Sequence, residues 1–189
     1  MAVKLLLALL CLALTGTAAP SPSTDNATKT TPLTGVTHSV VAGLGGLRFD
    51  PDNVVAQVGD VVEWHFLPRN HSVAQSSFAD PCRPLGSGSG SGSGSGFFPG
   101  FEFATEQGQA RNVFQIVVRD MATIWYYCPQ QAGDHCQNGM VGVVNQNFDN
   151  PGVSLSRYRE RAALTGRSVI PPVSDVGKVI VNPNPNGGF

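Results

Sequence analysis

Short runs of β-branched and aromatic residues are the feature that most constrains the fold of this 189-residue chain. In 61–66, Val62, Trp64 and Phe66 occupy alternate positions and so fall on one face of an extended strand. Gly, Pro, Asn or Asp separates such runs, and no helical periodicity lies between them. The pattern predicts an all-β domain, an antiparallel Greek-key sandwich or barrel. The expected strands are 36–41, 54–58, 61–66, 113–118, 124–128 and 140–144.

The composition of the chain changes on either side of this strand-rich domain, which spans residues 36–148. Residues 20–35 are polar, Thr-rich and interrupted by Pro, and they have too few apolar side chains to form a core. We expect them to be a flexible leader. Within the domain, residues 86–96 alternate Gly and Ser and are expected to form a surface loop.

The C-terminal extension, residues 149–189, differs from the domain in its residue pattern. Residues 154–164 contain good helix formers, with Ser154 near the start and Gly166 just past the end. These signals predict a short helix. The Pro- and Asn-rich tail that follows is expected to be disordered, so both ends of the chain are predicted to be flexible.

The first 19 residues have the features of a secretory signal peptide. Lys4 precedes an apolar core at 5–14, and small residues follow at 17–19. Ten apolar residues are too few to cross a bilayer, which needs about 20. The sequence therefore predicts a soluble protein without a transmembrane segment, secreted to the extracellular space or cell wall, with a glycosylation sequon at Asn26.

Composition excludes several classes of function. A net charge of −1 and the absence of a Lys/Arg cluster leave no electrostatic footprint for nucleic acid or an anionic membrane. The sequence has neither a Gly-x-Ser-x-Gly elbow nor paired carboxylates near a histidine, as a hydrolase would require.

Four residues form a candidate metal site: His71, Cys128, His135 and Met140. Two imidazoles, a thiolate and a thioether are the ligands of a blue-copper centre. Cys128 ends a predicted strand before Pro129, so one loop could deliver three ligands while His71 comes from elsewhere. Zinc would accept Cys and His but has little use for Met, so this set favours one type 1 copper ion.

The cysteine count is compatible with this site. Removal of a signal peptide would take Cys11 with it and leave Cys82, Cys128 and Cys136. An oxidising compartment favours one disulfide and leaves one thiol over. If Cys128 binds a metal, Cys82 and Cys136 are free to pair; the alternatives are an intermolecular disulfide or an unimportant buried thiol.

Several motifs occur in an order that resembles the cupredoxin, or blue-copper, family. The resemblance is narrower to the phytocyanin-like secreted copper proteins and to the cupredoxin-like extracellular proteins of fungi. It covers roughly residues 36–148. The motifs are Gly-Gly-Leu-Arg-Phe-Asp-Pro-Asp at 45–52, Val-Gly-Asp-Val-Val-Glu-Trp at 58–64, Asn-His-Ser-Val-Ala-Gln-Ser-Ser-Phe at 70–78, Trp-Tyr-Tyr-Cys-Pro at 125–129 and His-Cys-Gln-Asn-Gly-Met-Val-Gly-Val-Val-Asn at 135–145.

The resemblance assigns a role to each candidate ligand. It implies His71 and His135 as the two imidazole ligands, Cys128 as the thiolate and Met140 as the axial thioether. It also implies the disulfide between Cys82 and Cys136 that is typical of phytocyanin-like domains. This chain departs from the family in the six residues between Cys128 and His135, more than is usual, and in its Gly/Ser loop.

Together these observations predict a monomeric, non-enzymatic copper protein. It would transfer single electrons, with His135 as the exit route, or bind and deliver copper, in either case with an unidentified protein partner. Four histidines are too few for a multicopper oxidase, and His38 and His65 are expected to be ordinary surface residues. The alternative is a metal-free structural or interaction protein of the cell wall or extracellular matrix.

Overall fold

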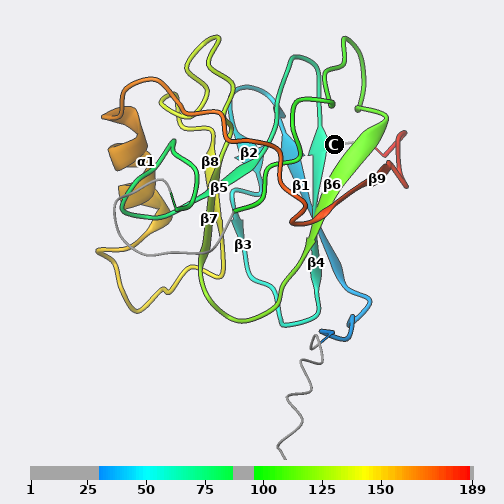
Figure 1. Ribbon diagram of the computed structural model, residues 1–189, viewed down its shortest axis with the longest axis horizontal. Coiled ribbons are helices and arrows are strands. Elements are labelled where there is room, and N and C mark those ends of the chain that lie inside the picture. The colour runs from blue at the N-terminus through cyan, green and yellow to red at the C-terminus, as the bar shows by residue number, and fades with distance from the viewer. Residues whose placement is uncertain (1–29, 87–95, 188–189) are drawn as a thin grey trace, which may run out of the picture. The chain divides into compact units, whose positions relative to one another are not determined.

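The computed structural model describes residues 30–86 and 96–187, and its compact unit begins at Thr31 (Figure 1). The predicted signal peptide, the Asn26 sequon, residues 20–29 of the leader and the centre of the Gly/Ser loop lie outside the described residues. The described part contains no helix that is long and apolar enough to cross a membrane.

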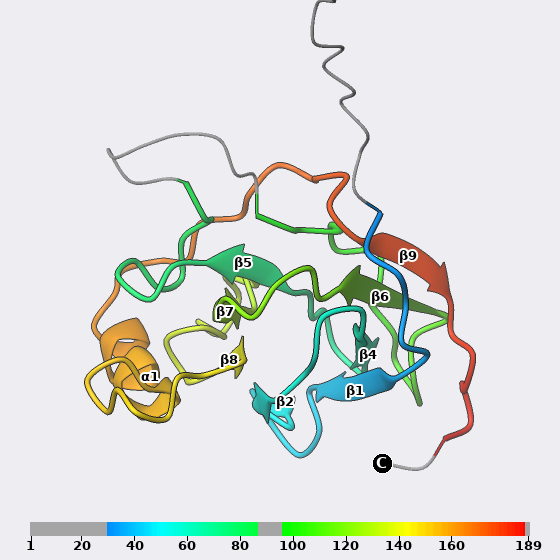
Figure 2. The same cartoon turned by 90° about the horizontal axis from the view of Figure 1, so that it is seen from below.

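Two sheets pack face to face (Figure 2). The first has the order β2-β1-β4-β6-β9 and the second the order β3-β8-β7-β5. The strands are β1 (Thr37–Ala42), β2 (Phe49–Asp50), β3 (Asn53–Val54), β4 (Val61–Phe66), β5 (Ala74–Ser76), β6 (Asn112–Val117), β7 (Ile124–Tyr127), β8 (Val141–Val144) and β9 (Lys178–Val181).

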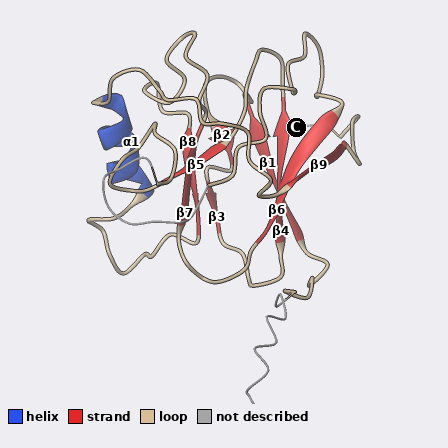
Figure 3. Ribbon diagram, in the orientation of Figure 1, coloured by secondary structure: helices blue, strands red, loops and turns tan. Residues whose placement is uncertain are grey.

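The predicted all-β sandwich is confirmed, with loops connecting most of the strands (Figure 3). Both sheets are mixed rather than purely antiparallel, because β1 pairs in parallel with β4 and β3 pairs in parallel with β8. Neither sheet closes into a barrel.

Trp64 on β4 lies at the centre of the core between the sheets. Its ring contacts those of Phe97, Phe114 and Tyr126, with centroid separations of 5.4, 5.8 and 5.3 Å. Val62 and Phe66 share the buried face of β4, as the alternation predicts. The core therefore joins β4 and β6 of one sheet to β7 of the other.

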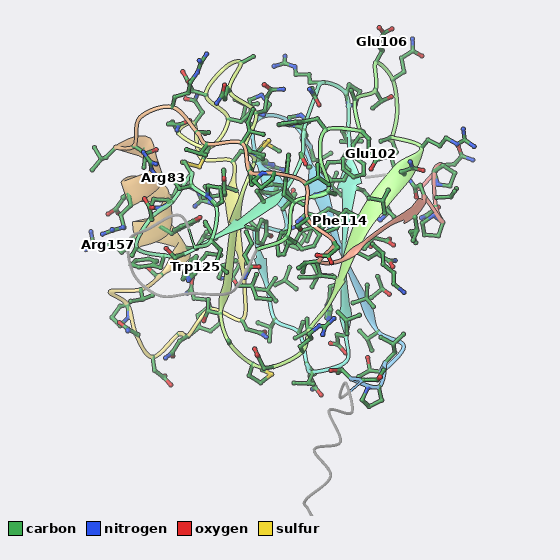
Figure 4. The ribbon with its side chains drawn as sticks, in the orientation of Figure 1. Arg83, Glu102, Glu106, Phe114, Trp125 and Arg157 are labelled. Carbon is green, nitrogen blue, oxygen red and sulfur yellow. A yellow bond between two sulfur atoms is a disulfide. The ribbon has the colours of Figure 1, made fainter. Side chains whose placement is uncertain are left out.

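The predicted short helix is confirmed as α1 (Leu155–Ala163). The side chain of Ser154 caps it by accepting a hydrogen bond from the backbone N–H of Arg157. Tyr158 is buried, and its ring centroid lies 4.8 Å from that of Trp125 on β7. Figure 4 shows Trp125 close to the helix, which covers the outer face of the second sheet.

Two expectations from the sequence are wrong, one about the C-terminal tail and one about His65, and both concern the outer face of the first sheet. The tail that was expected to be disordered contributes β9, which pairs with β6. His65, expected at the surface, is only 2% exposed and contacts the Glu63 carboxylate at 2.7 Å and the Gln109 side-chain oxygen at 2.8 Å. Gln109 also donates to the backbone oxygens of Asn184 and Gly187, so the tail covers a buried polar network.

Removing one side chain from this network tests whether the tail is ordered. Asn182 is buried and donates from Nδ2 to Gln109 Oε1 at 2.9 Å and to the Ala110 carbonyl at 3.3 Å. We expect Asn182→Ala to lower the free energy of unfolding by about 1–2 kcal/mol in urea titrations, because buried polar partners lose their hydrogen bonds. The exposed Asn184→Ala is the control and should change it by less than about 0.5 kcal/mol. Equal effects of the two variants would contradict an ordered tail.

Candidate metal centre

Three of the predicted ligands lie on one loop between β7 and β8. Cys128 directly follows the last residue of β7, and Met140 directly precedes the first residue of β8. The backbone N–H of Cys128 donates to the Met140 carbonyl, and that of Met140 donates to the His135 carbonyl, both at 3.0 Å. The N–H of His135 donates in turn to the Gln130 carbonyl at 3.3 Å. The six-residue stretch between Cys128 and His135 is thereby folded back onto the strand ends.

His71 reaches this loop from the segment between β4 and β5. The segment is fastened on both sides of His71, because the N–H of Arg69 donates to the Thr105 carbonyl and the Ser72 hydroxyl donates to the Gly100 carbonyl. The residues on both sides of His71 are thus held by contacts to the 100–105 loop, which is remote in sequence.

The structure brings His71, Cys128 and His135 together. One ligand atom from each of the three lies within 4.8 Å of the others. The Cys128 sulfur is 3.4 Å from Nδ1 of His135, and the two imidazole centroids are 4.9 Å apart. Cys128 is fully buried, and His71 and His135 are 1% and 4% exposed. Two imidazoles and a thiol therefore converge in a buried site.

The Nδ1 atom of His71 is buried and has no hydrogen-bond partner among the described residues. Buried polar atoms are normally paired, because an unpaired one costs about 1–3 kcal/mol. A metal ion bound by this nitrogen would supply the missing partner. The donor set therefore fits a metal with affinity for imidazole and thiolate.

Burial keeps the three groups uncharged. It raises the pKa of the Cys128 thiol to about 11. Burial, with a smaller effect of His135, lowers the pKa of His71 to about 4. Burial and the positive charge of Arg69 lower the pKa of His135 as well. At neutral pH both imidazoles are free to bind a metal, whereas the thiol must release a proton first.

Met140 is fully buried in the same core cluster as Cys128. Its backbone bonds to Cys128 and His135 place it beside both residues. The role of its thioether as an axial ligand stays a prediction.

The structure contains the disulfide between Cys82 and Cys136, whose Cα atoms are 5.8 Å apart. Cys136 follows His135 directly, so the disulfide ties the ligand loop to a segment 54 residues earlier in the chain. Cys128 is the free cysteine of the described residues. This leaves one thiol for the candidate site.

Sequence reasoning missed the residues that surround the two imidazoles. A hollow of about 220 Å³ over His71 is lined by Gly43, Leu47 and Arg69, among others. Gly43 has φ +97° and lies against the ring, where a methyl group would be 2.6 Å from Nε2 of His71. The glycine-rich stretch 43–46 was the available signal, but nothing in the sequence connects it with His71.

Comparisons with known proteins give two sequence relatives from Arthroderma benhamiae. An "extracellular serine-rich protein" is 33% identical over 135 residues, covering 71% of this chain and 48% of the relative. A "probable GPI-anchored cupredoxin-1" is 28% identical over 132 residues, covering 70% of this chain and 61% of the relative. The chain thus spans about half to three-fifths of the length of these relatives. No family model matches the chain.

Solved structures with low sequence identity were also found. A pseudoazurin from Hyphomicrobium denitrificans is 17% identical, with 70% of this chain and 100% of that chain covered and a TM-score of 0.39. A pseudoazurin from Methylobacterium extorquens AM1 is 20% identical, with 67% and 94% covered and a TM-score of 0.35.

The two facing sheets and the single short helix of the described residues agree with the sequence relationship to a protein named as a cupredoxin. The chain has a cupredoxin-like fold.

Proposed function

We propose that this chain is a mononuclear type 1 copper protein that transfers single electrons or binds and delivers copper, and that it is not an enzyme. The observation that carries the proposal is the convergence of His71, Cys128 and His135 in a buried site where a ring nitrogen of His71 has no partner. The likeness to a protein named as a cupredoxin supports the same function.

The chemistry of the donors favours copper. His71, Cys128 and His135 would hold the ion, with Met140 as the weak axial ligand. Bound copper would supply one-electron exchange between Cu(II) and Cu(I), for which soft sulfur ligands and imidazoles are suited. The core and the backbone bonds around Cys128 hold the donors in position.

The other two histidines of the chain are engaged elsewhere. Nε2 of His38 contacts Asp60 at 2.8 Å, and both ring nitrogens of His65 contact side chains of the buried network. The described residues hold one group of His, Cys and acidic side chains close enough together to bind a metal. This supports a single copper ion and an electron carrier rather than a multicopper oxidase.

The relatives support an extracellular or cell-surface location, because one is named as extracellular and the other as GPI-anchored. The signal peptide predicted at residues 1–19 agrees with secretion. We propose a secreted monomer that exchanges electrons or copper with another extracellular protein.

Stoichiometric addition of Cu(II) to the purified protein tests the proposal. We expect an intense blue absorption band and narrow copper hyperfine splitting, with the Cys128 thiol protected from titration, because a Cu–thiolate bond produces the charge-transfer band. Cys128→Ser should abolish the band. A colourless wild-type protein with a reactive Cys128 would instead favour the metal-free structural role.

Replacement of Met140 tests the axial ligand. Met140→Gln should retain the blue band and lower the reduction potential, because an amide oxygen stabilises Cu(II) better than a thioether. Voltammetry of both proteins measures the difference. An unchanged potential would remove Met140 from the proposed ligand set.

Gly43 provides a test of the position of His71. Gly43→Ala would place a methyl group 2.6 Å from Nε2 of His71 and displace the imidazole. We expect copper affinity to fall by about 10- to 100-fold, the usual cost of disturbing a ligand's support, measured by competition with a chelator. Gly45→Ala is the matched control: its φ is also positive, at +67°, and its methyl group would meet no atom of the described residues within 4 Å. Equal losses in both variants would show that backbone strain, not His71, is responsible.

A further inference from the structure

Arg69 is an exposed cation beside the candidate metal centre. One residue, Asn70, separates it from His71 in the sequence, and its backbone adopts a left-handed conformation with φ +93°, unusual for a residue other than glycine. The hydrogen bond from its N–H to the Thr105 carbonyl, at 3.1 Å, holds the backbone in place. The guanidinium forms no ion pair or hydrogen bond within residues 30–86 and 96–187.

Arg69 and Leu47 line two hollows, one over each imidazole. The hollow over His135, which we call the His135 hollow, has a volume of about 230 Å³. A water molecule takes about 30 Å³ in the liquid, so the hollow has room for a small organic ion. It is lined by Leu47, Arg69, Asn70, Gln130, Ala132, Gly133 and His135.

The polar groups of the His135 hollow favour an anion. Arg69 offers a fixed positive charge, and Asn70 lines the same hollow with a side chain whose amide NH2 can donate a hydrogen bond. Leu47 and Ala132 add apolar surface for the body of an organic ligand. A guanidinium binds carboxylates through charge-assisted, often bidentate, hydrogen bonds.

The acidic residues that are next to this hollow in sequence do not line it. None of its lining residues is acidic. Glu106 follows Thr105, the backbone partner of Arg69, and Figure 4 shows its side chain at the outer tip of the loop. Asp134 is exposed and is not among the lining residues, although it precedes His135 in sequence.

We propose that the His135 hollow binds a small organic carboxylate, with Arg69 as the residue that selects for negative charge. A carboxylate on the guanidinium would place the body of the ligand against Leu47, Ala132 and the edge of His135. Its relevance to electron exchange rests on the proposed function, in which His135 joins the protein surface to copper. The binding site itself does not require the metal.

Titration of the copper-free protein with benzoate, followed by ¹H–¹⁵N NMR, tests the site. We expect the amide signals of Arg69, Asn70 and Gly133 to shift, and Arg69→Gln to weaken binding about fivefold. Arg119→Gln is the matched control, since Arg119 is also exposed but follows β6 at the opposite end of the sandwich, and it should leave affinity unchanged. Equal affinity of wild type and Arg69→Gln would overturn the proposal.

Two further probes define the ligand class. Benzamide has the shape of benzoate without its charge. It should bind about fivefold more weakly than benzoate, the same factor as that expected for Arg69→Gln. Inorganic phosphate should also bind more weakly, because it makes no contact with the apolar wall. Equal binding of benzamide would overturn the role of Arg69 in charge selection, and equal binding of phosphate would overturn the assignment to an organic anion.

The copper-loaded protein separates this inference from the proposed function. If the blue band forms, Arg69→Gln should slow reduction by the ferrocyanide anion about fivefold relative to reduction by the hexaammineruthenium(II) cation. Benzoate binding through Arg69 without a blue band would keep the anion site and reject the copper proposal. A blue band without benzoate binding would keep the copper proposal and reject the anion site.

Discussion

The backbone hydrogen bonds that join Cys128 to Met140 and Met140 to His135 are the constraint on which the site depends. They hold the end of β7, the ligand loop and the start of β8 together, so the positions of three candidate ligands follow from the pairing of two core strands. Tyr126 and Val144 on these strands lie in the core cluster that also contains Trp64. The disulfide at Cys136 fastens the loop from the other side. A change in the packing of this sheet would therefore move the site, whereas the loop surface can vary more freely.

The sequence points to candidate site residues where a side chain typical of metal ligands stands at a position that the strand pattern defines. His71, Cys128 and His135 could be predicted because their side chains are typical metal ligands and because Cys128 ends a recognisable strand. Gly43 and Arg69 carry no comparable signal. Gly43 meets His71 through the tertiary fold, and the place of Arg69 between two hollows follows from its left-handed backbone and its pairing with Thr105. Supporting residues of this kind depend on contacts between remote segments, which single-sequence patterns do not encode.

The same reasoning explains the errors in the fold. Alternation along β4 correctly places Val62, Trp64 and Phe66 on one face and His65 on the other. It does not reveal what covers the second face, and here Gln109 and a tail more than 100 residues away enclose His65. The strands β2, β3 and β5 span only two or three residues each, too few for periodicity to be visible. Their pairing partners, not their own sequences, make them strands.

Burial affects both the protonation of the candidate ligands and their hydrogen bonding. The environment that keeps the Cys128 thiol and the two imidazoles uncharged also leaves Nδ1 of His71 without a partner, which is unfavourable for the metal-free protein. Packing elsewhere in the core offsets a cost of this kind. If the site binds copper as proposed, donors held by the core need little rearrangement when the charge of the ion changes by one. The same burial covers the donors, and Leu47 and Arg69 line the hollows over both imidazoles. If the site exchanges electrons or copper as proposed, the charge of Arg69 is where selection among partners can occur without altering the ligands themselves.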